Sequence, residues 1–217
     1  MEPGPDTKDK LLDAAEKLFV QQGIGATSLR NITTEAGANL ASIHYHFGSK
    51  DALIAELFKR RIGPINKERL KKLEALGDEK ESISLEKLVE AFVAPALHSQ
   101  ELSGEKGKNF VRLMGHIFSE SEKTQNLVLG QFSEVAQRFL DAFGSMLPDL
   151  PRQELSWRFE FSLGAMAMAM TGNRCTHKHL NIIEKDHDSC LLLQRLITYI
   201  AGALRAPAPQ FDEQENS

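Results

Sequence analysis

The chain has 217 residues, of which 41% are hydrophobic and 26% charged, and its formal net charge is −4. This length accommodates a small module and one larger core, and the negative net charge excludes nucleic-acid binding through bulk positive charge. The presence of only two cysteines, without an apolar run at the amino terminus, indicates a reducing, cytoplasmic setting. The longest apolar block, 159–171, is shorter than the roughly 20 residues of a membrane span, so no membrane partner is expected.

Three short helices are predicted within the first fifty residues. The first runs from about residue 6 to Gly23, since apolar side chains recur on one face of it. The second begins at Thr27, a suitable N-cap, and ends at Gly37, because glycine enters the left-handed conformation at low cost. The third begins at Asn39, another N-cap residue, and its apolar side is narrow. Two short helices around a tight turn, after a supporting helix, are typical of a helix-turn-helix DNA reader.

The outer side of the third helix carries small or hydrogen-bonding side chains, which suit base edges and phosphates in a major groove. Residues 1–61 hold eight acidic and eight basic residues, so this module is neutral as a whole. No acidic residue lies between Ala36 and Lys50, however, so the predicted reading surface does not repel phosphate. Taken alone, the same pattern also fits an ordinary helical hairpin.

This segment resembles the DNA-binding motif of the TetR/AcrR transcriptional regulators over about residues 6–57. The residues that carry the resemblance are a Thr-rich helix start, the Ala36-Gly37 turn and the ending Tyr45-His46-Phe47-Gly48-Ser49-Lys50. His44 departs from the pattern, since the family usually has an aromatic residue there. The resemblance implies base contacts by Asn39, Leu40, Ala41, Ser42 and His44. It implies phosphate contacts by Thr27, Ser28, Tyr45, His46 and Lys50.

The rest of the chain predicts further helices and no strands. Ser49 caps a connector helix that continues to about Leu76 and is bent by Pro64. Apolar residues then keep helical spacing, with a kink at Pro95, over 85–97, 110–118 and 128–147.

The expected fold is therefore all-α, with two domains. Residues 6–52 form a three-helix DNA-binding domain, and residues 53–206 form a larger helical domain for effector binding and dimerisation. Residues 207–217 form an acidic tail that we expect to be disordered.

The last two predicted helices lie at 153–173 and 193–204. The first is apolar or small nearly all round, and such a helix has to be covered on more than one side. A second copy of the chain is the most economical cover. A homodimer through the last two helices, arranged as a four-helix bundle, would also match the two-fold symmetry of a pseudo-palindromic DNA operator.

An effector cavity is predicted in the larger domain, because its bulky side chains are too many for a short bundle to pack without a gap. The predicted lining is Phe92, Phe110, Met114, Phe132, Phe139, Trp157 and Phe161. Arg112 and His116, four residues apart, either anchor an acidic head group or are solvated side chains at the edge of the apolar stripe. The predicted effector is thus small and apolar, and it carries an acidic head group if Arg112 and His116 serve as its anchor.

The segment from Cys175 to Cys190 holds residue types that can bind zinc. The residues concerned are Cys175, His177, His179, His187 and Cys190. Their spacing matches no closed zinc pattern, so a surface loop is the simpler interpretation, and no metal or other cofactor is predicted. No phosphate loop, zinc-protease pairing or nucleophile motif is present, so no catalytic residue is assigned. A helical enzyme or small-molecule carrier that uses the cavity is the alternative to a ligand-responsive repressor.

Overall fold

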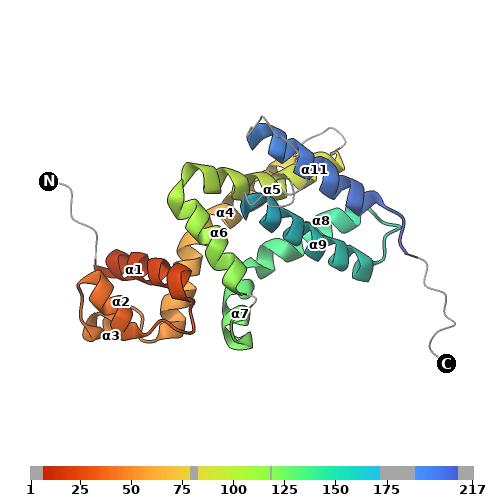
Figure 1. The fold of residues 1–217 in the computed structure, drawn as a ribbon. Helices are drawn as coiled ribbons and strands as arrows, with labels where there is room; N and C mark the ends of the chain where they lie inside the picture. The colour runs from red at the N-terminus through yellow and green to blue at the C-terminus, as the bar shows by residue number, and fades with distance from the viewer. Residues whose placement is uncertain (1–6, 79–82, 118, 172–188, 210–217) are drawn as a thin grey trace, which may run out of the picture. The chain divides into compact units, whose positions relative to one another are not determined.

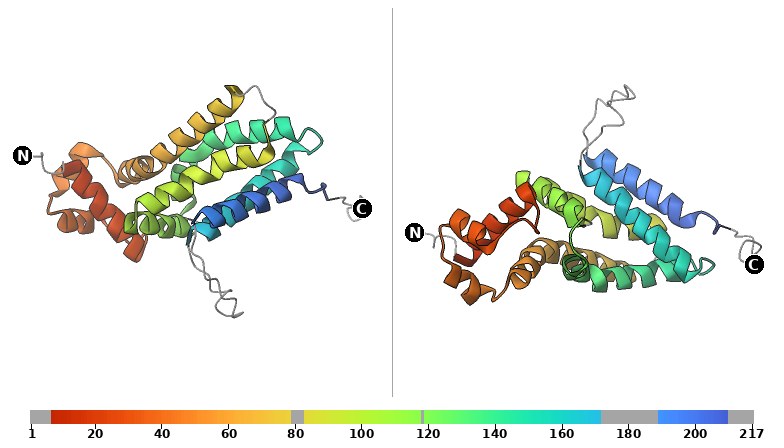
Figure 2. Two further views of the ribbon diagram at one scale, coloured as in Figure 1. Left: turned by 90° about the horizontal axis from the view of Figure 1, so that it is seen from above. Right: turned by 60° about the horizontal axis from the view of Figure 1, so that its bottom comes forward.

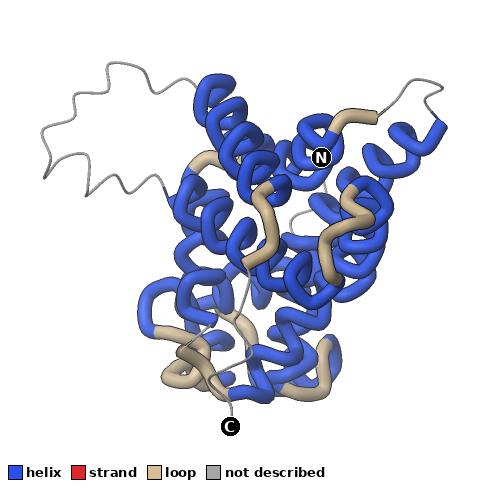
Figure 3. Tube along the Cα trace, turned by 90° about the vertical axis from the view of Figure 1, so that its right-hand side faces the viewer, coloured by secondary structure: helices blue, strands red, loops and turns tan. Residues whose placement is uncertain are grey.

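The computed structural model describes residues 7–78, 83–117, 119–171 and 189–209. The elements among these residues are all helical, which confirms the predicted all-α fold (Figures 1 and 3). In chain order they are α1 (Thr7–Gln22), α2 (Leu29–Ala36), α3 (Leu40–His46), α4 (Lys50–Asp78), α5 (Leu85–Leu102), α6 (Glu105–Ile117), α7 (Glu122–Leu129), the 3₁₀ turn η1 (Gly130–Phe132), α8 (Ser133–Met146), α9 (Arg152–Thr171) and α11 (Ser189–Arg205).

The predicted single helix over 128–147 is wrong, because the structure divides that stretch into α7, η1 and α8. The break is stabilised locally, since the Ser133 hydroxyl donates to the Gly130 carbonyl oxygen at 2.9 Å. A single 3₁₀ turn has three residues per turn instead of 3.6, so it disturbs the apolar spacing only slightly. The spacing alone therefore could not reveal the break.

The chain forms two compact units. The first combines the residues up to Leu70 with Pro95–Val135, and the second combines Lys71–Ala94 with the residues from Ala136 onward. Helices α6 and α7 thus belong to the same unit as α1, α2 and α3. The predicted division at residue 52 falls inside the first unit, because contacts distant in sequence join α6 and α7 to the amino-terminal helices.

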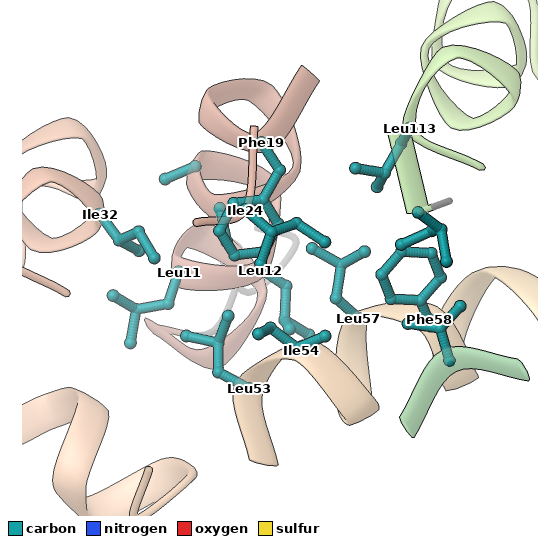
Figure 4. Close-up of a cluster of buried hydrophobic side chains, with 14 of the residues drawn as sticks. Leu11, Leu12, Phe19, Ile24, Ile32, Leu53, Ile54, Leu57, Phe58 and Leu113 are labelled. Carbon is teal, nitrogen blue, oxygen red and sulfur yellow. The ribbon is translucent and has the colours of Figure 1, made fainter. Parts of the chain in front are cut away.

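The core of the first unit is apolar and draws on both parts of the chain (Figure 4). Phe19 of α1, Leu57 and Phe58 of α4, and Leu113 of α6 are fully buried together. A partly buried ion pair reinforces the contact between α1 and α4, since the Arg61 guanidinium donates to the Glu16 carboxylate at 2.6 Å. The amino-terminal helices are therefore held on a support built from α4, α6 and α7.

The second unit is built around aromatic rings. The Phe92 ring centroid lies 5.0 Å from that of Phe139 and 5.1 Å from that of Phe159, and Phe143 packs beside them. Helices α9 and α11 lie side by side (Figure 2).

Arg158 joins α9 to the end of α11. Its side chain is 7% exposed. It forms an ion pair with Glu154, four residues earlier, in which the Arg158 Nε lies 2.8 Å from the Glu154 Oε1. Its guanidinium donates to the carbonyl oxygens of Ala203, Leu204, Ala206 and Pro207. These carbonyls have no partner within the helix, so Arg158 caps the carboxyl end of α11.

Candidate nucleic-acid interface

Helix α2 begins one residue later than the sequence predicts. Ser28 is its N-cap, because the Ser28 hydroxyl accepts from the Asn31 N–H at 3.1 Å, while the Asn31 side chain accepts from the Ser28 N–H at 3.1 Å. This reciprocal pair is a capping box built with asparagine. At the other end Gly37 has φ 62°, which confirms the predicted left-handed closure.

Thr27 was predicted to cap α2 and to contact phosphate, but its side chain points inward. It is 1% exposed, and its hydroxyl donates to the Gly23 carbonyl oxygen at 2.7 Å and accepts from Gln22 at 3.1 Å. The Thr27 hydroxyl therefore closes the turn between α1 and α2 and is not placed for a direct phosphate contact. Ser28, by contrast, is exposed.

Helix α3 has the predicted cap. The Asn39 side-chain oxygen accepts from the Ser42 N–H at 2.9 Å and from the Ser42 hydroxyl at 3.0 Å. Ile43 is completely buried and fixes α3 on the core. The structure therefore leaves one side of this helix for contact with another molecule.

The outer side of α3 carries most of the predicted contact residues. Leu40 is 38% and Tyr45 86% exposed. Ala41 and His44 are also exposed, whereas Ser42 and His46 are half-buried. The Tyr45 ring packs edge-on against His46, with centroids 5.0 Å apart.

The His44 ring is fixed by the turn that follows α3. Its Nδ1 lies 3.2 Å from the Gly48 carbonyl oxygen. Gly48 has φ 76°, a conformation that other residues rarely adopt, so the turn depends on glycine.

The turn between α1 and α2 is held by two charged side chains. Lys50, at the start of α4, donates to the Ile24 carbonyl oxygen at 2.6 Å. Glu120, between α6 and α7, accepts from the N–H groups of Ile24 and Gly25 at 2.9 and 3.2 Å. Nothing in the sequence around Glu120 points to this role, since no local signal reveals a contact that spans about a hundred residues. Lys50 thus has a structural role in addition to its predicted phosphate contact.

The predicted effector residues do not gather in one place. Phe110, Met114 and Phe132 pack against the core of the first unit, whereas Phe92 and Phe139 are buried in the second. The interior position predicted for Trp157 and Phe161 is wrong, because they are 52% and 67% exposed and stack on each other with centroids 6.0 Å apart. Helical spacing identifies an apolar stripe but not what covers it.

Arg112 and His116 lie on the exposed face of α6. Arg112 donates to Asn109 at 3.3 Å and lies 3.6 Å from Glu105. This arrangement is that of solvated side chains, the second of the two interpretations. A surface hollow of about 410 Å³ between α8 and α9 contains none of the predicted effector residues. Its lining is Asp141, Gly144, Ser145, Leu150, Arg152 and Leu155.

Most of the candidate zinc ligands lie outside the described residues, namely Cys175, His177, His179 and His187. Cys190, in the first turn of α11, is exposed. Within the part of the chain that the structure describes, no three His, Cys, Asp or Glu side chains form a group that could hold a metal ion. In the same residues, no helix is long and apolar enough to cross a membrane.

Two family models match the chain. Residues 11–57 match "Bacterial regulatory proteins, tetR family", and residues 90–203, more than half of the chain, match "Tetracyclin repressor-like, C-terminal domain". The two matched regions contain the helix-turn-helix and most of the remaining helices, respectively.

Individual relatives resemble mainly the amino-terminal module. The HTH-type transcriptional regulator AcrR of Shigella flexneri is 39% identical over 54 residues, 25% of each chain. The HTH-type nicotine-responsive transcriptional repressor HdnoR of Paenarthrobacter nicotinovorans is 38% identical over 64 residues, 28% of this chain and 33% of the relative. The matched segment therefore spans only a quarter to a third of these relatives.

A solved structure extends the likeness of fold to almost the whole chain. The fatty acid degradation regulator FadR from Bacillus halodurans has a TM-score of 0.61 at 15% identity and covers 95% of this chain and 100% of its own. The match to the larger family model, the helix-turn-helix geometry and the shared fold agree with one another. The chain therefore belongs to the TetR family of bacterial regulatory proteins.

Proposed function

We propose that the protein is a ligand-responsive repressor, which binds a pseudo-palindromic operator as a homodimer and is released by a small apolar effector. The observation that carries the DNA-binding part is the outer side of α3, where Ala41, His44 and Tyr45 are exposed while Ile43 anchors the helix. A short helix with an acid-free outer side fits a major groove without repelling phosphate. Tyr45, His46 and Lys50 contact the phosphates in this proposal, and the amino-terminal part of α3 faces the bases.

Replacing Tyr45 with alanine should weaken binding to every duplex by a similar factor, because a phosphate contact positions the protein without reading sequence. Loss of one hydrogen bond corresponds to about a 2- to 12-fold loss of affinity for each half-site. The measurement is a gel-shift titration against duplexes selected with the parent protein from a random library.

The matched control for Tyr45→Ala is Lys67→Ala, which removes an exposed lysine from α4 outside the predicted interface. It should bind like the parent. Tyr45→Ala is a cleaner probe than Lys50→Ala, since Lys50 also holds the turn before α2. Parent-like binding by Tyr45→Ala would contradict the proposed orientation of α3.

The homodimer part is supported by an apolar stripe on α9. Trp157, Phe161, Gly164 and Met168 follow each other at spacings of four, three and four residues, so they share one face, and all four are exposed. Tyr199 on α11 is 64% exposed. Large exposed apolar side chains in such a row are typical of a protein interface. The proposed interface thus uses the two aromatic residues that the sequence assigned to the effector cavity.

Replacing Phe161 with arginine should convert the dimer into monomers, because it places two charges in the centre of a two-fold interface. Ala167→Arg, on the same exposed side, should act in the same direction. Arginine at Leu196 of α11 would not be a suitable test, because Leu196 is 6% exposed within one protomer and the change would disturb the fold.

Sedimentation velocity at micromolar concentration measures the result, and circular dichroism shows whether each variant is folded. Ala75→Arg, at an exposed position of α4, is the matched control and should remain dimeric. A parent protein that sediments as a monomer would rule out this interface.

The names of related proteins support the proposal that this protein responds to a small apolar effector. One relative is a nicotine-responsive repressor, and one protein of the same fold is a fatty acid degradation regulator. An effector changes DNA binding only if it binds the protein more tightly when the two DNA-binding modules have one spacing than when they have another. Helix α4 contributes to both compact units and is the connector that sets this spacing in our proposal. Titrating long-chain acids, acyl thioesters and neutral apolar amines into the operator complex tests it, and dissociation by one class identifies the effector chemistry.

A further inference from the structure

Hydrogen bonds within the helix occupy part of the polar atoms that α3 offers to base edges. Of the five residues predicted to face bases, Leu40 and Ala41 are apolar. Asn39 and Ser42 bond to each other, because the Ser42 hydroxyl donates to the Asn39 side-chain oxygen that also caps the helix. The Asn39 amide N–H groups and the lone pairs of the Ser42 oxygen remain available. His44 differs from both residues because its ring is held from outside the helix, by Gly48.

The structure also determines which kind of hydrogen bond the neutral His44 ring can make. Its Nδ1 is 3.2 Å from the Gly48 carbonyl oxygen, within hydrogen-bonding distance. A carbonyl oxygen only accepts, so Nδ1 has to carry the proton. In a neutral imidazole the other nitrogen then has a lone pair and no proton. Because His44 is exposed, Nε2 is the atom that the ring offers to a ligand, and it offers it as an acceptor.

We propose that His44 is a specificity-determining residue of α3 and that its Nε2 accepts a hydrogen bond from the exocyclic amino group of adenine or cytosine. This inference rests on the proposed binding of α3 in a major groove. In that groove adenine N6 and cytosine N4 are the hydrogen-bond donors, whereas guanine and thymine offer acceptors at the corresponding positions. A tyrosine here could both donate and accept through its hydroxyl, but a histidine held at Nδ1 selects for donors.

The test compares selected DNA sequences. The full chain and its His44→Phe variant each select duplexes from a random library at about pH 8, where an ordinary imidazole is neutral. The parent should require adenine or cytosine at one position of each half-site. His44→Phe keeps an aromatic ring but has no nitrogen, so it should lose the preference at that position and keep it elsewhere. His44→Arg, which only donates, should change the preference at that position to guanine.

A second measurement uses the parent protein alone and so does not depend on whether the variants fold. The amino group at the preferred position is removed by placing purine in place of adenine, or 2-pyrimidinone in place of cytosine. The parent should lose about 2- to 12-fold in affinity for each half-site. Where His44→Phe folds, it should bind the two duplexes equally, so that the two losses are not additive.

His46→Phe is the matched control, since it makes the same chemical change two residues further along α3. It should weaken all duplexes alike, as expected for a phosphate contact. If the parent selects a sequence and neither His44→Phe nor removal of the amino group alters binding at any one position, the role of His44 is disproved while DNA binding stands. If the parent selects no sequence at all, the proposed operator binding itself fails.

Discussion

Replacing Arg158 with alanine should lower the free energy of unfolding by about 3 kcal/mol, because it removes the buried member of a partly buried ion pair together with its hydrogen bonds. The variant leaves the Glu154 carboxylate without its cation, and it leaves four carbonyl oxygens at the end of α11 without their donor. Buried polar groups that lose their partners are costly because they have already given up water. Urea denaturation at a fixed protomer concentration measures the loss, since the stability of the proposed dimer would depend on concentration.

Arg152 offers a matched control on the same helix. Its side chain is half-exposed, and its ion pair with Asp141, at 2.8 Å, lies at the surface, so Arg152→Ala should change stability little. Arg158→Met separates the two roles of the buried residue, because it keeps the apolar stem without the donors. A methionine variant as stable as the parent would show that the hydrogen bonds to α11 do not matter.

Replacing Phe139 with alanine should also cost about 3–5 kcal/mol, as expected for a fully buried phenylalanine. The Phe139 ring lies between the rings of Phe92 and Phe143, at centroid distances of 5.0 and 6.2 Å. Its removal opens a gap that the neighbouring rings fill only in part, so the lost contacts add to the lost burial. Thermal unfolding by calorimetry measures the change.

Two controls make the Phe139 prediction sharper. Phe139→Leu removes less volume and should cost clearly less than the alanine variant. Leu102→Ala removes a side chain that is 91% exposed and should stay within about 0.5 kcal/mol of the parent. Equal stability of Phe139→Ala and the parent would mean that the aromatic cluster is loosely packed.

The DNA-binding module was largely predictable from the sequence, and the reason is that local interactions define it. The Asn39 cap and the left-handed Gly37 each depend on residues within a few positions along the chain. The same holds for the stripe of α3, where one buried isoleucine orients the whole helix. The cap of α2 was misplaced by one residue because Thr27 and Ser28 are both good caps. The hydrogen bond from the Thr27 hydroxyl to Gly23 and the capping box of Ser28 with Asn31 distinguished them.

The larger domain was less predictable, because its important contacts join residues far apart in the chain. Arg158 reaches the end of α11 across more than forty residues, and Glu120 reaches the turn before α2 across more than ninety. Arginine and glutamate side chains are ordinarily solvated, so neither has a recognisable pattern in the sequence.

The sequence by itself therefore determined most of the helices and the helix-turn-helix, since capping and apolar spacing act over one or two turns. The class of regulator came instead from the resemblance of this motif to the TetR/AcrR regulators. Only the tertiary structure decided that Trp157 and Phe161 face outward while Phe92 and Phe139 are buried. It also decided that Nδ1 of His44 faces the Gly48 carbonyl oxygen. The physical reason is that the elements packed against a side chain decide whether it is buried and what it bonds to. Helical periodicity contains no information about those elements.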